Sequence, residues 1–155
     1  MATLLHIDSS PLYGRSVSRE LTAAFVSQWK ASHPDGRVVD RDLNATAMPP
    51  INAEWVGAVY TPEQARTPQQ KELLSLSDSL LAELEQADEY VIGVPMRMAS
   101  FNFVEPYLRS VFGFLGVTDA TFLTAGGTSA LNQGKDRNTF LAPHLQAVQT
   151  HAQTF

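Results

Sequence analysis

Short apolar segments alternate with amphipathic segments along this chain of 155 residues, and this alternation constrains its fold more than any other feature. The apolar run Thr3–Ile7 is typical of a strand buried on both faces of a parallel sheet. Further strands are expected over Arg37–Leu43, Glu89–Val94 and Ala120–Ala125. Helices are expected between them, because strands that alternate with helices imply right-handed crossovers. The sequence therefore predicts an α/β fold, a parallel sheet with helices on both faces, in a single domain over residues 1–155.

The sequence predicts where several helices begin and end. Ser16 or Ser18 is expected to cap a helix that runs to about Ser32. Shorter or later helices are expected over residues 53–60, 104–115 and 138–153. Thr67-Pro68-Gln69-Gln70 predicts a long helix from an N-cap, an N1 proline and a capping box. The leucines expected on its buried stripe are Leu73, Leu76, Leu80, Leu81 and Leu84. On the helix before Gly116, the expected apolar stripe is Val104, Tyr107, Leu108, Val111, Phe112 and Leu115.

The loop Ser9–Arg19 lies between the first expected strand and the first expected helix. A helix N-terminus presents unpaired N–H groups and the positive end of the helix dipole, so it binds anions readily. Ser10, Ser16 and Ser18 add hydroxyl groups, and Arg15 adds charge. Ordinary capping explains the same serines about as well. Either way, the loops after the first and third strands share the edge of the sheet where ligands bind in such folds.

Composition excludes several classes of function. The net charge of −5, with eleven scattered Lys and Arg residues, argues against a nucleic-acid partner. The absence of cysteine excludes disulfides, thiolate nucleophiles and Cys-ligated zinc. The four histidines show no metal-ligand spacing, so no metal site is expected. No secretory signal or membrane span is visible, and a cytoplasmic protein is expected. No side-chain nucleophile is evident, so the chemistry of an enzyme here would belong to a cofactor.

Four segments, taken in order, resemble one family, the FMN-dependent NADH-azoreductases. They are Leu5–Pro11, Arg15–Arg19, Val91–Met96 and Pro106–Asp119. The resemblance implies a flavodoxin-like fold and a homodimer that binds FMN. It also implies ping-pong hydride transfer from NADH or NADPH, through the flavin, to a quinone or an azo compound. By position, Ser10, Ser16, Val17 and Ser18 match the family's phosphate loop, and Met96 and Arg97 match the start of the loop that contacts the flavin ring and ribityl chain.

The chain departs from the family pattern after residue 96. The family has a helix, a further strand and a glycine-rich flavin loop there, whereas this chain has only residues 97–105 before the next helix. A strand–helix–strand unit takes about 30 residues or more, so one strand–helix unit is expected to be missing. Two explanations stand: an internal stretch is absent from this sequence alone, or the chain is truly deleted and keeps a four-stranded sheet. The alternative functions are a non-catalytic flavodoxin-like binding or dimerisation module and a phosphate-ester hydrolase that uses Ser10.

Overall fold

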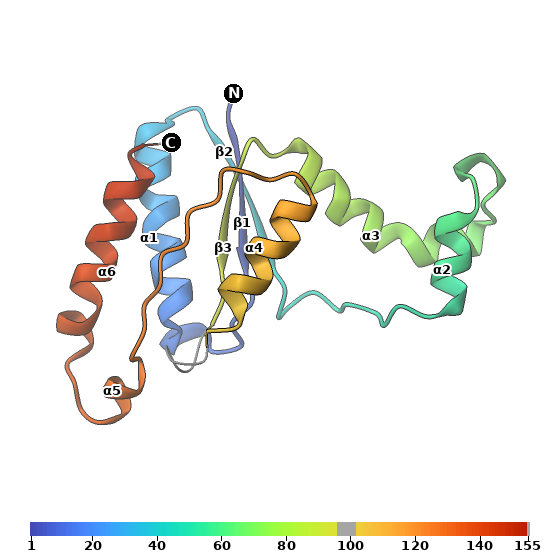
Figure 1. Cartoon of the computed structure of the whole chain (residues 1–155). Coiled ribbons are helices and arrows are strands. Elements are labelled where there is room, and N and C mark those ends of the chain that lie inside the picture. Colours follow the sequence, from blue (N-terminus) through green and yellow to red (C-terminus); the bar gives the residue numbers. More distant parts are fainter. Residues whose placement is uncertain (96–101, 155) are drawn as a thin grey trace.

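Three parallel strands form the sheet in the computed structural model, which describes residues 1–95 and 102–154 (Figure 1). They are β1 (Thr3–Asp8), β2 (Arg37–Asp42) and β3 (Glu89–Gly93), in the order β2-β1-β3. Both neighbours of β1 are parallel to it, and Leu5 lies opposite Val39 on one side and Tyr90 on the other. The chain leaves β1 in one direction to reach β2 and returns past it to reach β3. This reversal of strand order makes the end of β1 a topological switch point.

The prediction of a strand at Ala120–Ala125 is wrong, because residues 117–127 form neither helix nor strand. A strand exists through hydrogen bonds to a neighbour. The four-stranded sheet expected of a truly deleted chain is therefore wrong as well, since the described residues form a sheet of three strands. By the family pattern, the strand that would lie between β3 and this segment belongs to the missing unit. Without that neighbour the segment has no strand with which to pair.

Helices lie on both faces of the sheet, as predicted (Figure 1). Helix α1 (Val17–Ser32) and helix α6 (Arg137–Ala152) pack side by side on one face. Helix α2 (Ala53–Tyr60) packs against the outer end of helix α3 (Pro68–Gln86), which begins there and runs back to the other side of the sheet. The remaining helical elements are α4 (Val104–Phe114), α5 (Ser129–Asn132) and the 3₁₀ turns η1 (Tyr13–Arg15) and η2 (Glu63–Ala65).

The period-two alternation of β1 divides its side chains between the two faces. Leu4 points toward α1 and α6, where it joins Phe25, Trp29, Val148 and Ala152 in the main core. Trp29 is fully buried, and its indole N–H donates to the Glu89 carboxylate on β3. Leu5, also buried, lies on the α3 side. His6 and Asp8 share the face of Leu4, so the strand that builds the core also brings polar groups toward α1.

The start of α3 is as predicted, but its buried stripe is not. The Thr67 hydroxyl accepts from the Gln70 N–H, and the Gln70 side chain accepts from the Thr67 N–H, which completes the capping box. Leu74 is the buried residue of this helix, whereas Leu81 and Leu84 are 54% and 44% exposed. The helix begins beside α2 and runs back toward the sheet (Figure 1), so α2 covers only its outer, N-terminal part.

Helix α4 ends as its sequence predicts. Gly116 has a φ of +83°, and the N–H groups of Gly116 and Val117 donate to the carbonyls of Gly113 and Phe112. These two bonds form a Schellman motif. The expected stripe is not buried, since Tyr107 is 67% and Leu115 66% exposed. None of the described helices is long and apolar enough to cross a membrane.

Substitution in α3 tests this packing directly. Leu74→Ala is expected to lower the free energy of unfolding by about 2–5 kcal/mol, because it leaves a cavity at a residue that is 1% exposed. Leu81→Ala, on the same helix, is expected to change it by only about 0.5 kcal/mol. Urea denaturation followed by circular dichroism measures both values. Equal losses in the two variants would contradict the assignment of the buried face.

Candidate functional site

The three strands end together beneath the loop that contains the predicted serines. Asp8, Asp42 and Gly93 are the last residues of β1, β2 and β3, and Asp8 lies in register with the other two. The loop after β1 is tied to the end of β3, because the N–H and the hydroxyl of Ser9 both donate to the Gly93 carbonyl, at 3.2 and 2.9 Å. The predicted phosphate loop therefore lies at the switch point between β1 and β3.

Ser16 is the N-cap of α1. Its hydroxyl accepts from the Arg19 N–H at 3.3 Å and lies 3.1 Å from the Ser18 hydroxyl. The first N–H groups of a helix have no partner within the helix. Those of Val17 and Ser18 make no hydrogen bond with any part of the chain that the structure describes. Two hydroxyls and two open N–H groups thus gather at the positive end of the α1 dipole, an arrangement that suits an anion.

Ser10 is only 2% exposed, and its hydroxyl accepts from the Leu12 N–H at 3.3 Å. This hydrogen bond shapes the turn that leads into η1. The Ser10 hydroxyl contacts no histidine among the described residues, so it lacks the general base that a serine nucleophile requires. The hydrolase alternative therefore has no support in this geometry.

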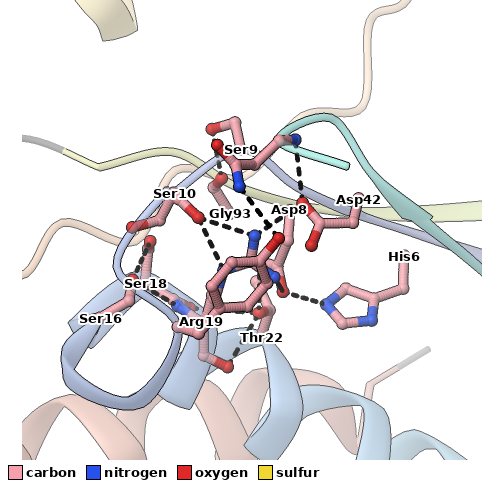
Figure 2. Close-up of polar contacts among 12 residues, drawn as sticks. His6, Asp8, Ser9, Ser10, Ser16, Ser18, Arg19, Thr22, Asp42 and Gly93 are labelled. Atoms are coloured by element: carbon pink, nitrogen blue, oxygen red, sulfur yellow. Dashed lines mark hydrogen bonds and ion pairs between the residues drawn. The ribbon is translucent and has the colours of Figure 1, made fainter. Parts of the chain in front are cut away.

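Arg19 holds the loop from the side of α1 (Figure 2). Its Nε and Nη2 donate to the Ser10 carbonyl at 2.9 and 2.7 Å, and Nη2 also donates to Asp42 Oδ1 at 2.6 Å. Nη1 lies 3.5 Å from Asp8 Oδ2. The guanidinium carbon is 4.4 Å from the centre of the Tyr13 ring, within the range of a cation–π contact. One side chain therefore joins β1, β2, the loop and η1.

Asp8 is the buried carboxylate at the centre of this network. Its Oδ1 accepts from the Thr22 hydroxyl at 3.0 Å, and its Oδ2 lies 3.3 Å from His6 Nε2. That histidine contact satisfies distance but not hydrogen-bond geometry, whereas His6 Nδ1 and Asp40 Oδ1 are hydrogen-bonded at 2.8 Å. The network extends across β1 to the edge strand β2.

The ion pair between Arg19 and Asp42 changes the acidity of both groups. The hydrogen bond from Arg19 lowers the pKa of the Asp42 carboxyl below its ordinary value. The same bond raises the pKa of the Arg19 guanidinium, against the opposing effect of burial. Both groups are charged at neutral pH, and neutralise one another beside the loop.

Gly93 lies too close to Asp8 for any side chain. A Cβ atom at this position would lie 2.3 Å from Asp8 Oδ1 and 3.0 Å from Thr22 Cγ2. The absence of a side chain lets β3 approach the carboxylate beneath the loop. A side chain at this position would displace the Asp8 carboxylate.

The structure brings together Ser10, Ser16, Val17 and Ser18, four of the six predicted cofactor-binding residues. Their role in binding stays a prediction, and Met96 and Arg97 lie outside the described residues. Arg15, expected to add charge, is exposed on η1 and forms no ion pair with a described residue. The residue that sequence reasoning missed is Arg19. The sequence pattern that could have predicted its role is an arginine three positions after an N-cap serine, together with aspartates at the ends of two expected strands.

Comparison with known proteins shows which family this chain is similar to. The family described as having a flavodoxin-like fold matches residues 2–101. An FMN-dependent NADH:quinone oxidoreductase of Burkholderia lata is 41% identical, over 96% of this chain and 98% of the relative. One of Acidobacterium capsulatum is also 41% identical, over 98% of this chain and 100% of the relative.

Solved structures share the fold at much lower identity. An azoreductase of Bacillus anthracis strain Sterne superimposes with a TM-score of 0.83, 16% identity and full coverage of both chains. An FMN-dependent NADH-azoreductase of Bacillus anthracis strain Ames Ancestor, solved in complex with FMN, gives a TM-score of 0.80 at 17% identity over 98% of each chain. These similarities establish the fold.

The relatives are longer than this chain in its interior. The Burkholderia lata alignment extends over 203 positions, whereas 96% of 155 residues is about 149 residues, so about 54 positions hold no residue of this chain. That difference is large enough for a strand–helix unit. It agrees with the expectation that the chain is short of one such unit, and with the three-stranded sheet.

Replacement of Gly93 tests the packing of β3 against Asp8. Gly93→Ala is expected to cost about 1–3 kcal/mol of unfolding free energy, because the methyl group displaces the Asp8 carboxylate. Gly57→Ala is the matched control, since nothing lies within 4 Å of a Cβ at Gly57 in α2. It is expected to stabilise the protein by up to about 1 kcal/mol, because alanine favours a helix. Thermal or urea unfolding of both variants measures the difference, and an unchanged Gly93→Ala protein would refute the contact.

The lowered pKa of Asp42 predicts a dependence of stability on pH. A carboxyl with a depressed pKa in the folded state stabilises the protein above its ordinary pKa of 3.8, and this contribution is lost as the pH falls through the folded value. Asp42→Asn is therefore expected to lose less stability on acidification than the wild type. The free energy of unfolding, measured from neutral pH to below 3.8, checks this. Asp78→Asn, an exposed position on α3, is expected to keep the wild-type slope. A wild-type slope for Asp42→Asn would show that the ion pair is absent.

Proposed function

We propose that this chain, which belongs to the family of FMN-dependent NADH:quinone oxidoreductases with a flavodoxin-like fold, is itself an FMN-dependent enzyme that oxidises NADH and reduces quinones. The observation that carries the proposal is the hydroxyl-lined N-terminus of α1, placed at the carboxyl end of the central strand. The relatives that share 41% identity carry this activity in their names. The position of the loop in the fold and the similarity to these relatives thus both support FMN as the cofactor.

The residues of the loop fit the phosphate end of FMN. The open N–H groups of Val17 and Ser18 donate to phosphate oxygens, and the hydroxyls of Ser16 and Ser18 rotate to donate as well. Ser10 lines the turn beside them. The α1 dipole favours the negative charge, and Arg19 neutralises Asp42 beside the loop. Such a cradle binds a phosphate monoester without a dedicated metal.

The flavin ring is proposed to lie toward the loop after β3, where Met96 and Arg97 contact it. When bound, FMN supplies the redox chemistry by accepting a hydride from NADH and passing it to the acceptor. We propose a ping-pong order, in which the two substrates use the same face of the flavin ring in turn. We also propose that azo compounds serve as further acceptors. The protein's part is to hold the phosphate, orient the ring and admit flat aromatic molecules. A single domain, a homodimeric assembly and a cytoplasmic location complete the proposal.

Flavin binding and turnover test this function. The purified chain, incubated with FMN and desalted, is expected to retain stoichiometric flavin that absorbs near about 450 nm. Without oxygen it is then expected to oxidise one NADH per bound flavin, and to continue turning over only when a quinone is present. Ser18→Ala is expected to weaken FMN binding by about tenfold, since it removes one hydroxyl from the cradle. Ser75→Ala is the matched control, because Ser75 is exposed on α3 and its hydroxyl donates to the Glu72 carbonyl.

A folded, colourless chain that binds no FMN and shows no NADH-dependent turnover would contradict the proposal. That result would instead favour the non-catalytic flavodoxin-like module. Turnover of an aryl phosphate in the absence of flavin would favour the hydrolase.

A further inference from the structure

The Arg19 guanidinium lies beside the proposed phosphate cradle, yet each of its three nitrogens already faces a partner within the protein. It contacts the Ser10 carbonyl through two nitrogens and Asp42 through one, and its third nitrogen faces Asp8. Its side chain is only 14% exposed. An arginine that binds a ligand directly turns its guanidinium toward the ligand, whereas this guanidinium is held on three sides by the protein. Its contribution to binding is therefore indirect.

We propose that Arg19 is a positioning residue that makes the loop accept a doubly charged phosphate monoester. The inference rests on the proposed function, because the phosphate in question is that of FMN. Two separate effects support it, one on the backbone of the loop and one on its charge.

The first effect is on the direction of a carbonyl group. Nε and Nη2 of Arg19 grip the Ser10 carbonyl oxygen at 2.9 and 2.7 Å. A free carbonyl oxygen in a phosphate loop repels phosphate oxygens, since both are acceptors. The planar fork of arginine fixes this oxygen toward α1, while the Ser10 hydroxyl shapes the turn with the Leu12 N–H. Lysine, with a single ammonium, supplies no such fork.

The second effect is on charge. The carboxylates of Asp8 and Asp42, whose side chains are 10% and 26% exposed, lie within 3.5 Å and 2.6 Å of Arg19. Partly buried like charges repel strongly, because little solvent screens them. Without Arg19, both carboxylates would act on a dianionic phosphate at the adjacent helix N-terminus. Loss of Arg19 is thus expected to weaken the binding of the phosphate. The loss of affinity is expected to be smaller when a carboxylate is removed as well.

A mutant cycle measured with FMN as the probe separates this role from a merely structural one. Arg19→Ala is expected to raise the Kd for FMN by about tenfold or more. The double variant Arg19→Ala with Asp42→Asn is expected to bind FMN several-fold more tightly than Arg19→Ala alone. Fluorescence titration gives each Kd, and urea unfolding of the same samples gives their stability. Rescue of binding by removal of a carboxylate is not expected if Arg19 only stabilises the fold.

Arg41 provides the matched control. It is a second arginine with a partly buried carboxylate partner, and its Nε donates to Glu83 at 2.9 Å. That pair joins β2 to α3, and the Arg41 guanidinium makes no hydrogen bond to Ser10 or Asp42. Arg41→Ala is expected to lower stability and leave the Kd for FMN within about twofold. Equal losses of FMN affinity in Arg19→Ala and Arg41→Ala would overturn the inference, as would a double variant that binds no better than Arg19→Ala.

Arg19→Lys covers the case in which Arg19→Ala does not fold. It keeps the charge and loses the fork, so its FMN affinity is expected to lie between those of the wild type and Arg19→Ala. Wild-type affinity in Arg19→Lys would overturn the role of the fork. If the wild-type chain itself binds no FMN, the proposed function fails; if it binds FMN and the Arg19 variants bind equally well, only the present inference fails.

Discussion

The contact of Arg19 with the Ser10 carbonyl, Asp8 and Asp42 is the interaction on which the functional end of this molecule depends. It joins the ends of two strands, the loop that follows the first, and the helix that follows the loop. The carboxylates offset the charge of the guanidinium, so the proposed phosphate cradle consists of hydroxyl and N–H dipoles. An arrangement of this kind is fixed before a ligand arrives, which lowers the ordering cost of binding.

The core and the site are built from one strand. In β1, Leu4 enters the core with Trp29, while His6 and Asp8, two and four residues later, face the same helix. The period of two therefore places apolar side chains at one end of α1 and polar ones at the other. Burial at the Trp29 end secures the helix, and the polar end positions its N-terminus. The core and the proposed binding site therefore share the elements β1 and α1.

Much of this arrangement is predictable from sequence, because it depends on local signals. The Ser16 cap, the capping box at Thr67 and the turn at Gly116 follow from residues within a few positions of one another. The failures all concern distant partners. The expected strand at Ala120–Ala125 lacks a neighbour, and Leu81 lacks a covering element. The Arg19–Asp42 ion pair was not predicted for the same reason, since these residues are 23 positions apart and meet only after the sheet forms.

The most direct test of the account is a comparison of FMN with riboflavin, which has the same ring system and no phosphate. If the cradle at α1 holds the cofactor by its phosphate, the wild-type chain binds FMN at least about tenfold more tightly than riboflavin, as expected for the loss of charge-assisted hydrogen bonds. Calorimetric titration of both flavins at one ionic strength gives the ratio. Equal affinities, or no affinity for either, would contradict the assignment of this loop as the phosphate site.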